Sequence, residues 1–389
     1  MSQNKRETSA IYIQGAMFVC SRRGPRLSII FSLSILLFAA CMYVWIIRYV
    51  TIASASRQPE VVPSSVLTDT NRHSNNVANE VNVVIAADFQ YIQGLPPLIH
   101  SILANTRNLD NIRIHIVVCD YPVDNLLQYL ECNDIRINKT LQVTQFTDSI
   151  ISTNIRAAWT KIFMARRLSS VCNYARAYLH RLLPGVSKVI FIDADTLVLS
   201  PIEDLWAESK IHKTPFQAVA RLSSYEKDFI LRDVSPIYHK RFGTYINGSL
   251  NTFSAGLFVM DLNYYREHNL VDEVEFWLIK QTESRHPLWQ LDCQSIFQLV
   301  YYNKWDRLSD IWSRFPSSVM LDNFSGIRGS IHWSGKPKPW MEFGTFSKAW
   351  KKYRPSECSG HGVCQNAENR TDWYCACNDF YHGTLCQHK

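Results

Sequence analysis

Two aspartates spaced two residues apart form the first group with evident chemistry. Asp193 and Asp195 flank Ala194, directly after the apolar run 189–192. In an extended segment, residues i and i+2 point the same way, so both carboxylates can face one ligand. Two hard oxygen ligands at a strand end suit Mn²⁺ or Mg²⁺, which in turn holds a diphosphate. The alternative is a surface pair that caps a turn, and the apolar strand before the pair favours the metal site.

A second polar segment follows Asp195 after 137 residues. It reads HWSGKPKPW over residues 332–340. The imidazole of His332 can complete the ligand set of a divalent metal. Gly335 allows the backbone to approach a phosphate closely, and Lys338 offers a cation to the same group. Taken alone, the segment would also fit a surface loop stiffened by its prolines.

The elements that must position these residues alternate between apolar strands and helices. We expect strands at 81–88, 112–118, 188–192, 216–220 and 255–260, and helices at 94–106 and 169–183. This alternation predicts an α/β head with a mainly parallel sheet. Ligands of such sheets bind beyond the carboxyl ends of the strands. Asp88 and the pair Asp193 and Asp195 both fall at such ends.

The N-terminal region predicts a membrane anchor. Residues 27–47 form 21 consecutive residues without a charge. At about 1.5 Å per residue, this run can cross a hydrocarbon core of about 30 Å. Three arginines stand just before the run, which favours a cytoplasmic N-terminus. We therefore expect a cytoplasmic tail at 1–26, a signal-anchor at 27–47 and a single-pass type II protein of the Golgi membrane with a lumenal head.

The remainder divides into a stem and two folded parts. Residues 50–80 contain no aromatic residue and are rich in Ser, Asn and Pro, so we interpret 48–80 as a stem. A catalytic head is expected at 81–353 and a small cysteine-rich module at 354–389. Residues 1–26 carry five basic residues and one acidic residue, more than half of the net charge of +7. The folded part therefore lacks the basic surface that a nucleic-acid partner requires.

Four N-glycosylation sequons agree with a lumenal head. All four lie beyond the predicted span, and none precedes it: Asn138, Asn247, Asn323 and Asn369.

Five separated motifs resemble those of glycosyltransferase family 8, in the same order over roughly residues 81–341. They are AAD-x-x-Y (86–91), YAR (174–176), FIDADTLVL (191–199), SAGLFVMDL (254–262) and H-x₅-KPW (332–340). The pattern is most similar to bacterial lipopolysaccharide galactosyltransferases, and glycogenin and animal xylosyltransferases are more distant. The resemblance implies a GT-A fold, a UDP-sugar donor, and Mn²⁺ with Mg²⁺ as the alternative. It also implies transfer to a glycan or glycoprotein hydroxyl with retention of the anomeric configuration.

The resemblance also assigns roles to residues. It implies that Asp193, Asp195 and His332 hold the metal. The nucleotide-sugar contacts that it implies are Ala86, Asp88, Tyr91, Arg176, Ala194, Ser254, Gly335 and Lys338. Asp292 and Gln294 are the candidates to contact the sugar near its anomeric carbon as catalytic residues. Their alternative is a helix N-cap followed by an exposed polar residue.

Two departures from the family pattern concern the sugar. Ser254 stands where the family often has Asn, and Cys293 separates Asp292 from Gln294 where the family has an adjacent Asp-Gln pair. The donor therefore stays open among UDP-galactose, UDP-glucose and UDP-xylose. Because no motif supplies an obvious carboxylate nucleophile, a front-face substitution assisted by the leaving diphosphate is favoured over a double displacement.

The C-terminal cysteines resemble the later five cysteines of an EGF-like module. That likeness implies the disulfides Cys358–Cys375 and Cys377–Cys386. Cys364 is then left over, either free or paired with one of Cys119, Cys132, Cys172 and Cys293. A zinc site with His361 and His382 is the alternative, and a lumenal location favours disulfides.

Two expectations concern this module. Because the head has its own apolar strands and all the donor motifs, we expect it to fold and to hydrolyse donor without residues after Tyr353. The competing function is a non-catalytic membrane lectin or adhesion protein that binds through the module.

Overall fold

The computed structural model describes residues 80–389 with short gaps at 137, 139, 154, 156–171, 210–213, 290, 317–325, 336, 342–346, 355 and 367–372. The predicted cytoplasmic tail, the anchor at 27–47 and the stem up to residue 79 lie outside the described residues. Among the helices of the described part, none is long and apolar enough to cross a bilayer.

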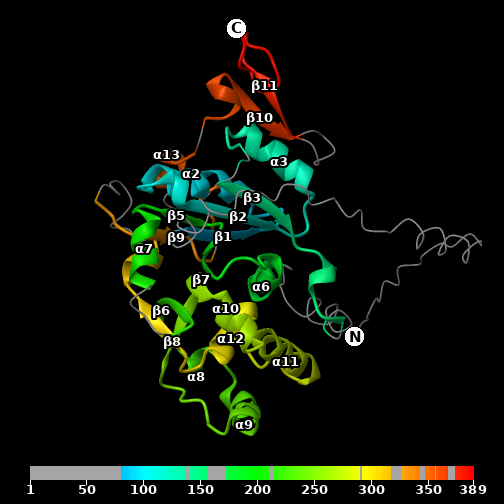
Figure 1. Cartoon of the computed structure of the whole chain (residues 1–389), viewed down its shortest axis with the longest axis vertical. Helices are drawn as coiled ribbons and strands as arrows, with labels where there is room; N and C mark the ends of the chain where they lie inside the picture. Colours follow the sequence, from blue (N-terminus) through cyan, green and yellow to red (C-terminus); the bar gives the residue numbers. More distant parts are fainter. Residues whose placement is uncertain are drawn as a thin grey trace, which may run out of the picture. The chain divides into compact units, whose positions relative to one another are not determined.

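A seven-stranded sheet forms the centre of the head (Figure 1), in the order β3-β2-β1-β4-β7-β6-β8. All strands but β7 run in one direction, because only the β4–β7 and β6–β7 pairs are antiparallel. The predicted α/β head with a mainly parallel sheet is therefore confirmed. The strands are β1 (Val81–Ala87), β2 (Ile112–Val118), β3 (Leu141–Gln145), β4 (Lys188–Asp193), β6 (Phe216–Ser224), β7 (Asn251–Asp261) and β8 (Trp305–Leu308).

The strand β4 shows why the sheet is buried on both faces. Val189 and Phe191 pack into one hydrophobic core, and Ile190 and Ile192 pack into a second core on the opposite face. A continuous apolar run is what a parallel strand covered on both faces requires.

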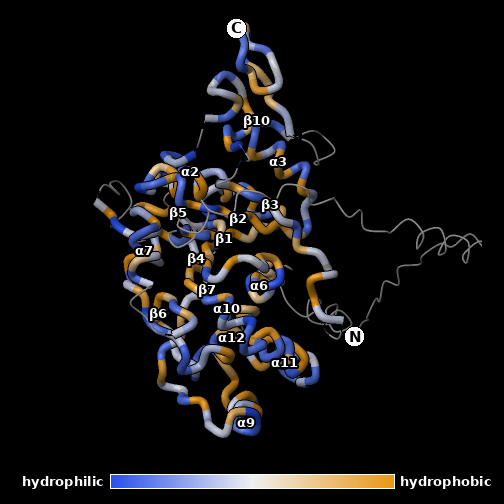
Figure 2. The backbone as a smooth tube through the Cα atoms, in the orientation of Figure 1, coloured by the Kyte–Doolittle hydropathy of each residue, from blue (hydrophilic) through white to orange (hydrophobic). Residues whose placement is uncertain are grey.

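Helices cover the two faces of the sheet, with α2 and α3 on one side and α10 to α12 on the other (Figure 1). Apart from the short helices between Cys172 and Leu182, the α-helices of the described residues are α2 (Leu95–Asn105), α3 (Val123–Cys132), α7 (Ile202–Ser209), α8 (Tyr225–Asp228), α9 (Leu231–Phe242), α10 (Leu262–Glu267), α11 (Leu270–Glu283), α12 (Asp292–Val300) and α13 (Ser347–Lys352). In α11, the acidic residues Asp272 and Glu273 lie in the first turn and Lys280 lies in the last turn, which complements the helix dipole. Figure 2 shows that hydrophilic and hydrophobic residues are mixed along this helix.

The expectation of one helix over 169–183 is wrong in the described part of that range. Three short pieces replace it: α5 (Cys172–Ala175), η5 (Arg176–Tyr178) and α6 (Leu179–Leu182). Arg176, Ala177 and Tyr178 are all buried, and Tyr178 has φ −111° and ψ 12°, outside the helical range. Tertiary contacts on every side of this turn override the local helical periodicity.

A small second sheet pairs β5 (Thr196–Val198) with β9 (Ser330–His332). The C-terminal module is a hairpin of β10 (Gly362–Asn366) and β11 (Trp373–Cys377). Its disulfides are the two that the EGF-like resemblance implies, Cys358–Cys375 and Cys377–Cys386. Cys364 pairs with Cys132 at the end of α3, and Cys119 pairs with Cys172. All five cysteines of the module are therefore in disulfides, which leaves none as a zinc ligand.

Candidate active site

The two sequence segments with metal-binding chemistry meet through the pairing of β5 with β9. Thr196 lies opposite His332 in this antiparallel pair. The Trp333 N–H donates to the Asp195 carbonyl oxygen at 2.9 Å. A three-residue strand pair thus fixes the imidazole beside the aspartates at the end of β4.

Asp193, Asp195 and His332 form one cluster of ligand atoms. The Nε2 atom of His332 lies 3.7 Å from Asp193 Oδ2 and 3.3 Å from Asp195 Oδ1. One ligand atom from each residue falls within 4.8 Å of the others. Asp195 and His332 are buried, whereas the Asp193 side chain keeps 26% of its surface exposed. This donor set of two carboxylates and one imidazole fits a divalent cation with an open side toward a substrate.

Gly256, to which the sequence motifs assigned no role, makes room for this cluster. A Cβ on Gly256 would lie 2.2 Å from His332 Cε1 and 2.8 Å from Asp193 Oδ2. Glycine inside a strand marks a close approach of another group to the backbone. The glycine within the otherwise apolar run AGLFVM was the signal that could have identified this position.

The backbone of Ala194 closely approaches a second glycine, Gly94. A Cβ on Gly94, just before α2, would lie 2.2 Å from the Ala194 carbonyl oxygen. The turn between Asp193 and Asp195 therefore rests directly on the start of α2. Ala194 itself is buried, and the described residues around it cover its surface.

Lys338 lies against the same carboxylate as His332. Its Nζ atom donates to the Asp195 carboxylate and, at 2.8 Å, to the Trp333 carbonyl oxygen. Burial alone would raise the pKa of Asp195, but the neighbouring His332 and Lys338 cations outweigh it and lower that pKa to about 2. Burial also opposes protonation of His332 and Lys338, and the adjacent Asp195 carboxylate outweighs it and raises the pKa of each. Asp195, His332 and Lys338 therefore each favour the charged form of the others' side chains where they are in contact.

Arg176 holds the other aspartate. Its Nη2 atom donates to Asp193 Oδ1 at 3.0 Å, and its Nη1 atom donates to the Ala255 carbonyl oxygen at 2.5 Å. The guanidinium group also lies over the Phe191 ring, 4.6 Å from its centroid. The structure thus places Arg176 in the site, where it joins the end of β4 to β7.

The residues predicted for the nucleotide lie at the end of β1, beside the cluster. Ala86 is opposite Asp193 in the β1–β4 register. The buried Asp88 accepts hydrogen bonds at Oδ1 from the Gln90 and Tyr91 N–H groups, at 2.9 and 3.2 Å. The Lys338 Nζ atom lies 5.2 Å from the centroid of the Tyr91 ring. A cation and an aromatic ring thus lie together next to the aspartates.

The residues predicted for the sugar lie along β7 and α12. The Ser254 Oγ atom accepts from the Gly256 N–H at 3.4 Å, and Gln294 Oε1 accepts from the Ala255 N–H at 3.3 Å. Gln294 is half-buried against β7, so it differs from the exposed polar residue of the alternative interpretation. Asp292 is the first residue of α12, and the position of its side chain lies outside what the structure describes. Gly335 has φ +89°, a left-handed conformation that favours glycine.

Two of the predicted sequons lie in the described part of the chain. Asn138 and Asn247 are exposed. Their Oδ1 atoms accept from the N–H of the hydroxyl residue two positions on, Thr140 at 2.7 Å and Ser249 at 3.0 Å. Asn323 and Asn369 lie outside the described residues.

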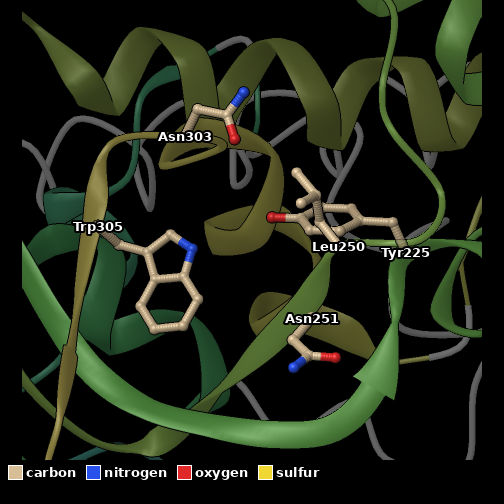
Figure 3. A pocket seen from close by; sticks show the side chains of 5 residues that line it. All are labelled: Tyr225, Leu250, Asn251, Asn303 and Trp305. Atoms are coloured by element: carbon tan, nitrogen blue, oxygen red, sulfur yellow. The ribbon is translucent and has the colours of Figure 1, made fainter.

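A separate pocket of about 400 Å³ lies at the start of β7 (Figure 3). It is lined by Tyr225, Leu250, Asn251, Asn303 and Trp305. None of the predicted site residues lines it. The Tyr225 hydroxyl donates a hydrogen bond to the Gln298 carbonyl oxygen at 2.9 Å, and the Trp305 ring packs edge-on against Phe253.

Comparisons with known proteins agree with the geometry. A family model described as "Glycosyl transferase family 8" matches residues 82–344. The chain is 27% identical over 278 residues to "Probable galacturonosyltransferase-like 10" of Arabidopsis thaliana, covering 67% of this chain and 71% of that protein. It is 27% identical over 277 residues to "Probable galacturonosyltransferase-like 7" of the same plant, covering 67% and 70%. The fold resembles a crystal structure of the galactosyltransferase LgtC with donor and acceptor sugar analogs, with a TM-score of 0.50 and 18% identity over 70% of this chain and 96% of that chain.

Proposed function

The chain belongs to glycosyltransferase family 8, and from this premise we propose that it is a retaining enzyme that transfers a sugar from a UDP-sugar to a glycan or glycoprotein hydroxyl. Glycosyltransferase activity follows from the family match over residues 82–344 and from the relatives. The donor, the ion and the stereochemistry are our proposal. The single observation that carries it is the convergence of Asp193, Asp195 and His332 from two distant segments.

We propose Mn²⁺ as the ion, because an imidazole joins the two carboxylates and Mg²⁺ prefers oxygen ligands. Asp193, Asp195 and His332 would hold it, and Arg176 orients the Asp193 carboxylate. A divalent ion bound there supplies Lewis-acid stabilisation of the leaving diphosphate. Lys338 brings a second positive charge to the same place, and Gly335 leaves the backbone of that loop open to a phosphate.

The donor is proposed to lie between the carboxyl end of β1 and the first residues of β7. Asp88, with Tyr91 and Ala86, would receive the uracil end, and Ser254 with Gln294 would receive the sugar. Because the Ala255 N–H already occupies Gln294 Oε1, the amide nitrogen is the group left to donate to the sugar. An amide is a poor nucleophile, so this residue supports front-face substitution rather than a covalent intermediate.

In that substitution, the bond between the anomeric carbon and the diphosphate oxygen breaks. The acceptor oxygen forms its bond to the same face of the anomeric carbon. The acceptor proton passes to an oxygen of the leaving diphosphate. Lys338 and Arg176 stabilise the negative charge that develops there, because both are fixed before the reaction begins.

A lumenal location in the Golgi membrane, with type II topology, is supported by two features of the described chain. Four disulfides join eight of its cysteines, which is typical of an oxidising compartment. The sequons at Asn138 and Asn247 are exposed and accessible to glycosylation. The predicted anchor at 27–47 would attach the head to the membrane. We do not retain the lectin alternative, because the metal and nucleotide motifs converge on one site.

The test is hydrolysis and transfer by the full-length chain in detergent, with and without Mn²⁺. The donor panel is UDP-galactose, UDP-glucose, UDP-xylose and UDP-galacturonate, the last because the Arabidopsis relatives are named for galacturonosyl transfer. Asp195→Ala is expected to abolish turnover of the preferred donor, because it removes an oxygen ligand. Asp204→Ala is the matched control, since Asp204 forms only a surface ion pair with Arg107 within the described residues. Wild-type turnover by Asp195→Ala would refute the metal assignment.

A further inference from the structure

The C-terminal module packs on the head at one defined place. The disulfide Cys132–Cys364 joins β10 to the end of α3. Trp373, the first residue of β11, places its ring 4.5 Å from the Tyr129 ring of α3, measured between centroids. Its backbone N–H donates to Gln128 Oε1 at 3.2 Å. Trp373 and Cys364 therefore pack against a hydrophobic core of the head rather than only against the module.

The indole of Trp373 reaches beyond α3. Its Nε1–H donates to the Tyr121 hydroxyl oxygen at 2.7 Å. Tyr121 is buried, with 4% of its surface exposed, and lies in the segment that follows β2. A hydrogen bond between the buried Tyr121 and the half-buried Trp373 fixes the position of both rings.

Tyr121 in turn contacts the loop that follows β1. Its ring lies 5.6 Å from the Phe89 ring, measured between centroids. The adjacent Asp120 accepts at Oδ1 from the Phe89 N–H at 3.3 Å. Phe89 directly follows Asp88, whose carboxylate shapes the turn to Tyr91. An unbroken series of contacts therefore runs from the module to the residues proposed to bind uracil.

The side chain of Tyr374 makes no contact that leads to the site, among the described residues. Tyr374, the next residue of β11, is 50% exposed, and its hydroxyl donates to Gln365 Oε1 within the hairpin. Successive residues of a strand point to opposite faces, so Trp373 faces the head and Tyr374 faces away. The hairpin thus offers a matched pair of aromatic positions, one coupled to the site and one not.

We propose that the C-terminal module is a positioning element for the nucleotide end of the donor site, acting through Trp373, Tyr121 and Phe89. This inference rests on the proposed function, in which Asp88 and Tyr91 receive the uracil. The module holds the segment after β2, and that segment holds the loop after β1 in the shape that the nucleotide needs. Trp373 and Tyr121 are positioning residues, since neither is among the residues proposed to contact the donor.

The test compares Trp373→Phe, Tyr121→Phe and the double variant with the control Tyr374→Phe, all in the full-length chain. Each of the two single variants removes one partner of the Trp373–Tyr121 hydrogen bond and keeps an aromatic ring. The KM for the donor and the inhibition constant of UDP are expected to rise up to about tenfold, the net contribution of one hydrogen bond of this kind. The kcat at saturating donor and the KM for the acceptor should stay at wild-type values.

The double variant separates positioning from general damage. Because it removes both partners of one hydrogen bond, it should be no worse than either single variant. Amide hydrogen exchange in residues 88–92 supplies a readout that needs no turnover. Exchange there should accelerate about tenfold in Trp373→Phe and remain unchanged in Tyr374→Phe.

The outcomes distinguish this inference from the proposed function. If the wild-type chain binds no UDP, the proposed function fails, and the inference that rests on it fails too. If the wild type binds UDP but both single variants keep its donor KM and its exchange rates, the inference alone is overturned. A rise in the acceptor KM at constant donor KM would also overturn it and would assign the module to the acceptor.

Discussion

The substitution Gly256→Ala tests the geometry of the metal cluster without replacing any of its ligands. Gly256 lies in β7, and a Cβ there would meet His332 Cε1 at 2.2 Å and Asp193 Oδ2 at 2.8 Å. Both neighbours are proposed metal ligands. The added methyl group must therefore displace the cluster or push β7 away from it, because packed interiors leave no room for an extra carbon.

The size of the effect follows from these distances. Ordinary carbon contacts begin near 3.4 Å, so the His332 ring or β7 must shift by about 1.2 Å. Metal–ligand distances tolerate only about 0.2 Å of error. We therefore expect the affinity for Mn²⁺ to fall by about 100-fold, the upper end of what changes around metal ligands cost. Overpacking should lower the free energy of unfolding by about 1–3 kcal/mol, which leaves the fold intact.

The assay is a titration of UDP-sugar hydrolysis with Mn²⁺, together with thermal unfolding of the same samples. Gly185→Ala is the control, because a Cβ at Gly185 would meet no heavy atom within 4 Å. The control should keep wild-type Mn²⁺ dependence. If Gly256→Ala also keeps the wild-type Mn²⁺ dependence and turnover, then β7 does not confine the ligands as described, and the reasoning is refuted.

Three further predictions concern stability, the module and topology. Burial, aided by Arg113, lowers the pKa of His115 to about 4 from an unfolded value of about 6.5, so the free energy of unfolding should fall by up to about 3 kcal/mol as pH drops through that interval. Chemical denaturation of His115→Gln should lose the His115 share of this slope and keep that of His180, whose pKa burial also lowers to about 4; a slope equal to that of the wild type would assign it to other groups. Stopping the chain after Tyr353 should lower the yield of folded protein and its donor affinity, because it removes the Cys132–Cys364 link; unchanged yield and KM would contradict this. Replacing residues 1–49 by a cleavable signal should give a secreted glycoprotein. In that protein, Asn247→Gln should increase the mobility on a gel by the mass of one glycan. Secretion without any shift on deglycosylation would contradict the lumenal assignment.

The prediction for the chain stopped after Tyr353 differs from the expectation drawn from the sequence. The apolar strands of 81–353 suggested a head that needs no C-terminal module. The structure instead joins the module to α3 by a disulfide and by the packing of Trp373 on Tyr129. The four candidate partners of Cys364 could not be separated from the sequence, because disulfide pairing depends on distances in the folded chain.

The sequence by itself determined the features that depend on local pattern. The apolar run before Asp193 predicted a strand buried on both faces, with Asp193 and Asp195 at its carboxyl end. Five motifs in the same order identified family 8, which the family match over residues 82–344 confirmed. Strands β3 and β8 were not predicted, since each is short, and in neither is a full face buried.

Only the tertiary structure decided how distant segments meet. The pairing of Thr196 with His332, the space left by Gly256 and the contact of Lys338 with Asp195 each join residues far apart in the chain. Periodicity records which face of an element is apolar, but not which element covers it or at what register. Close packing and the pairing of buried charges set those choices, and both are properties of the assembled core.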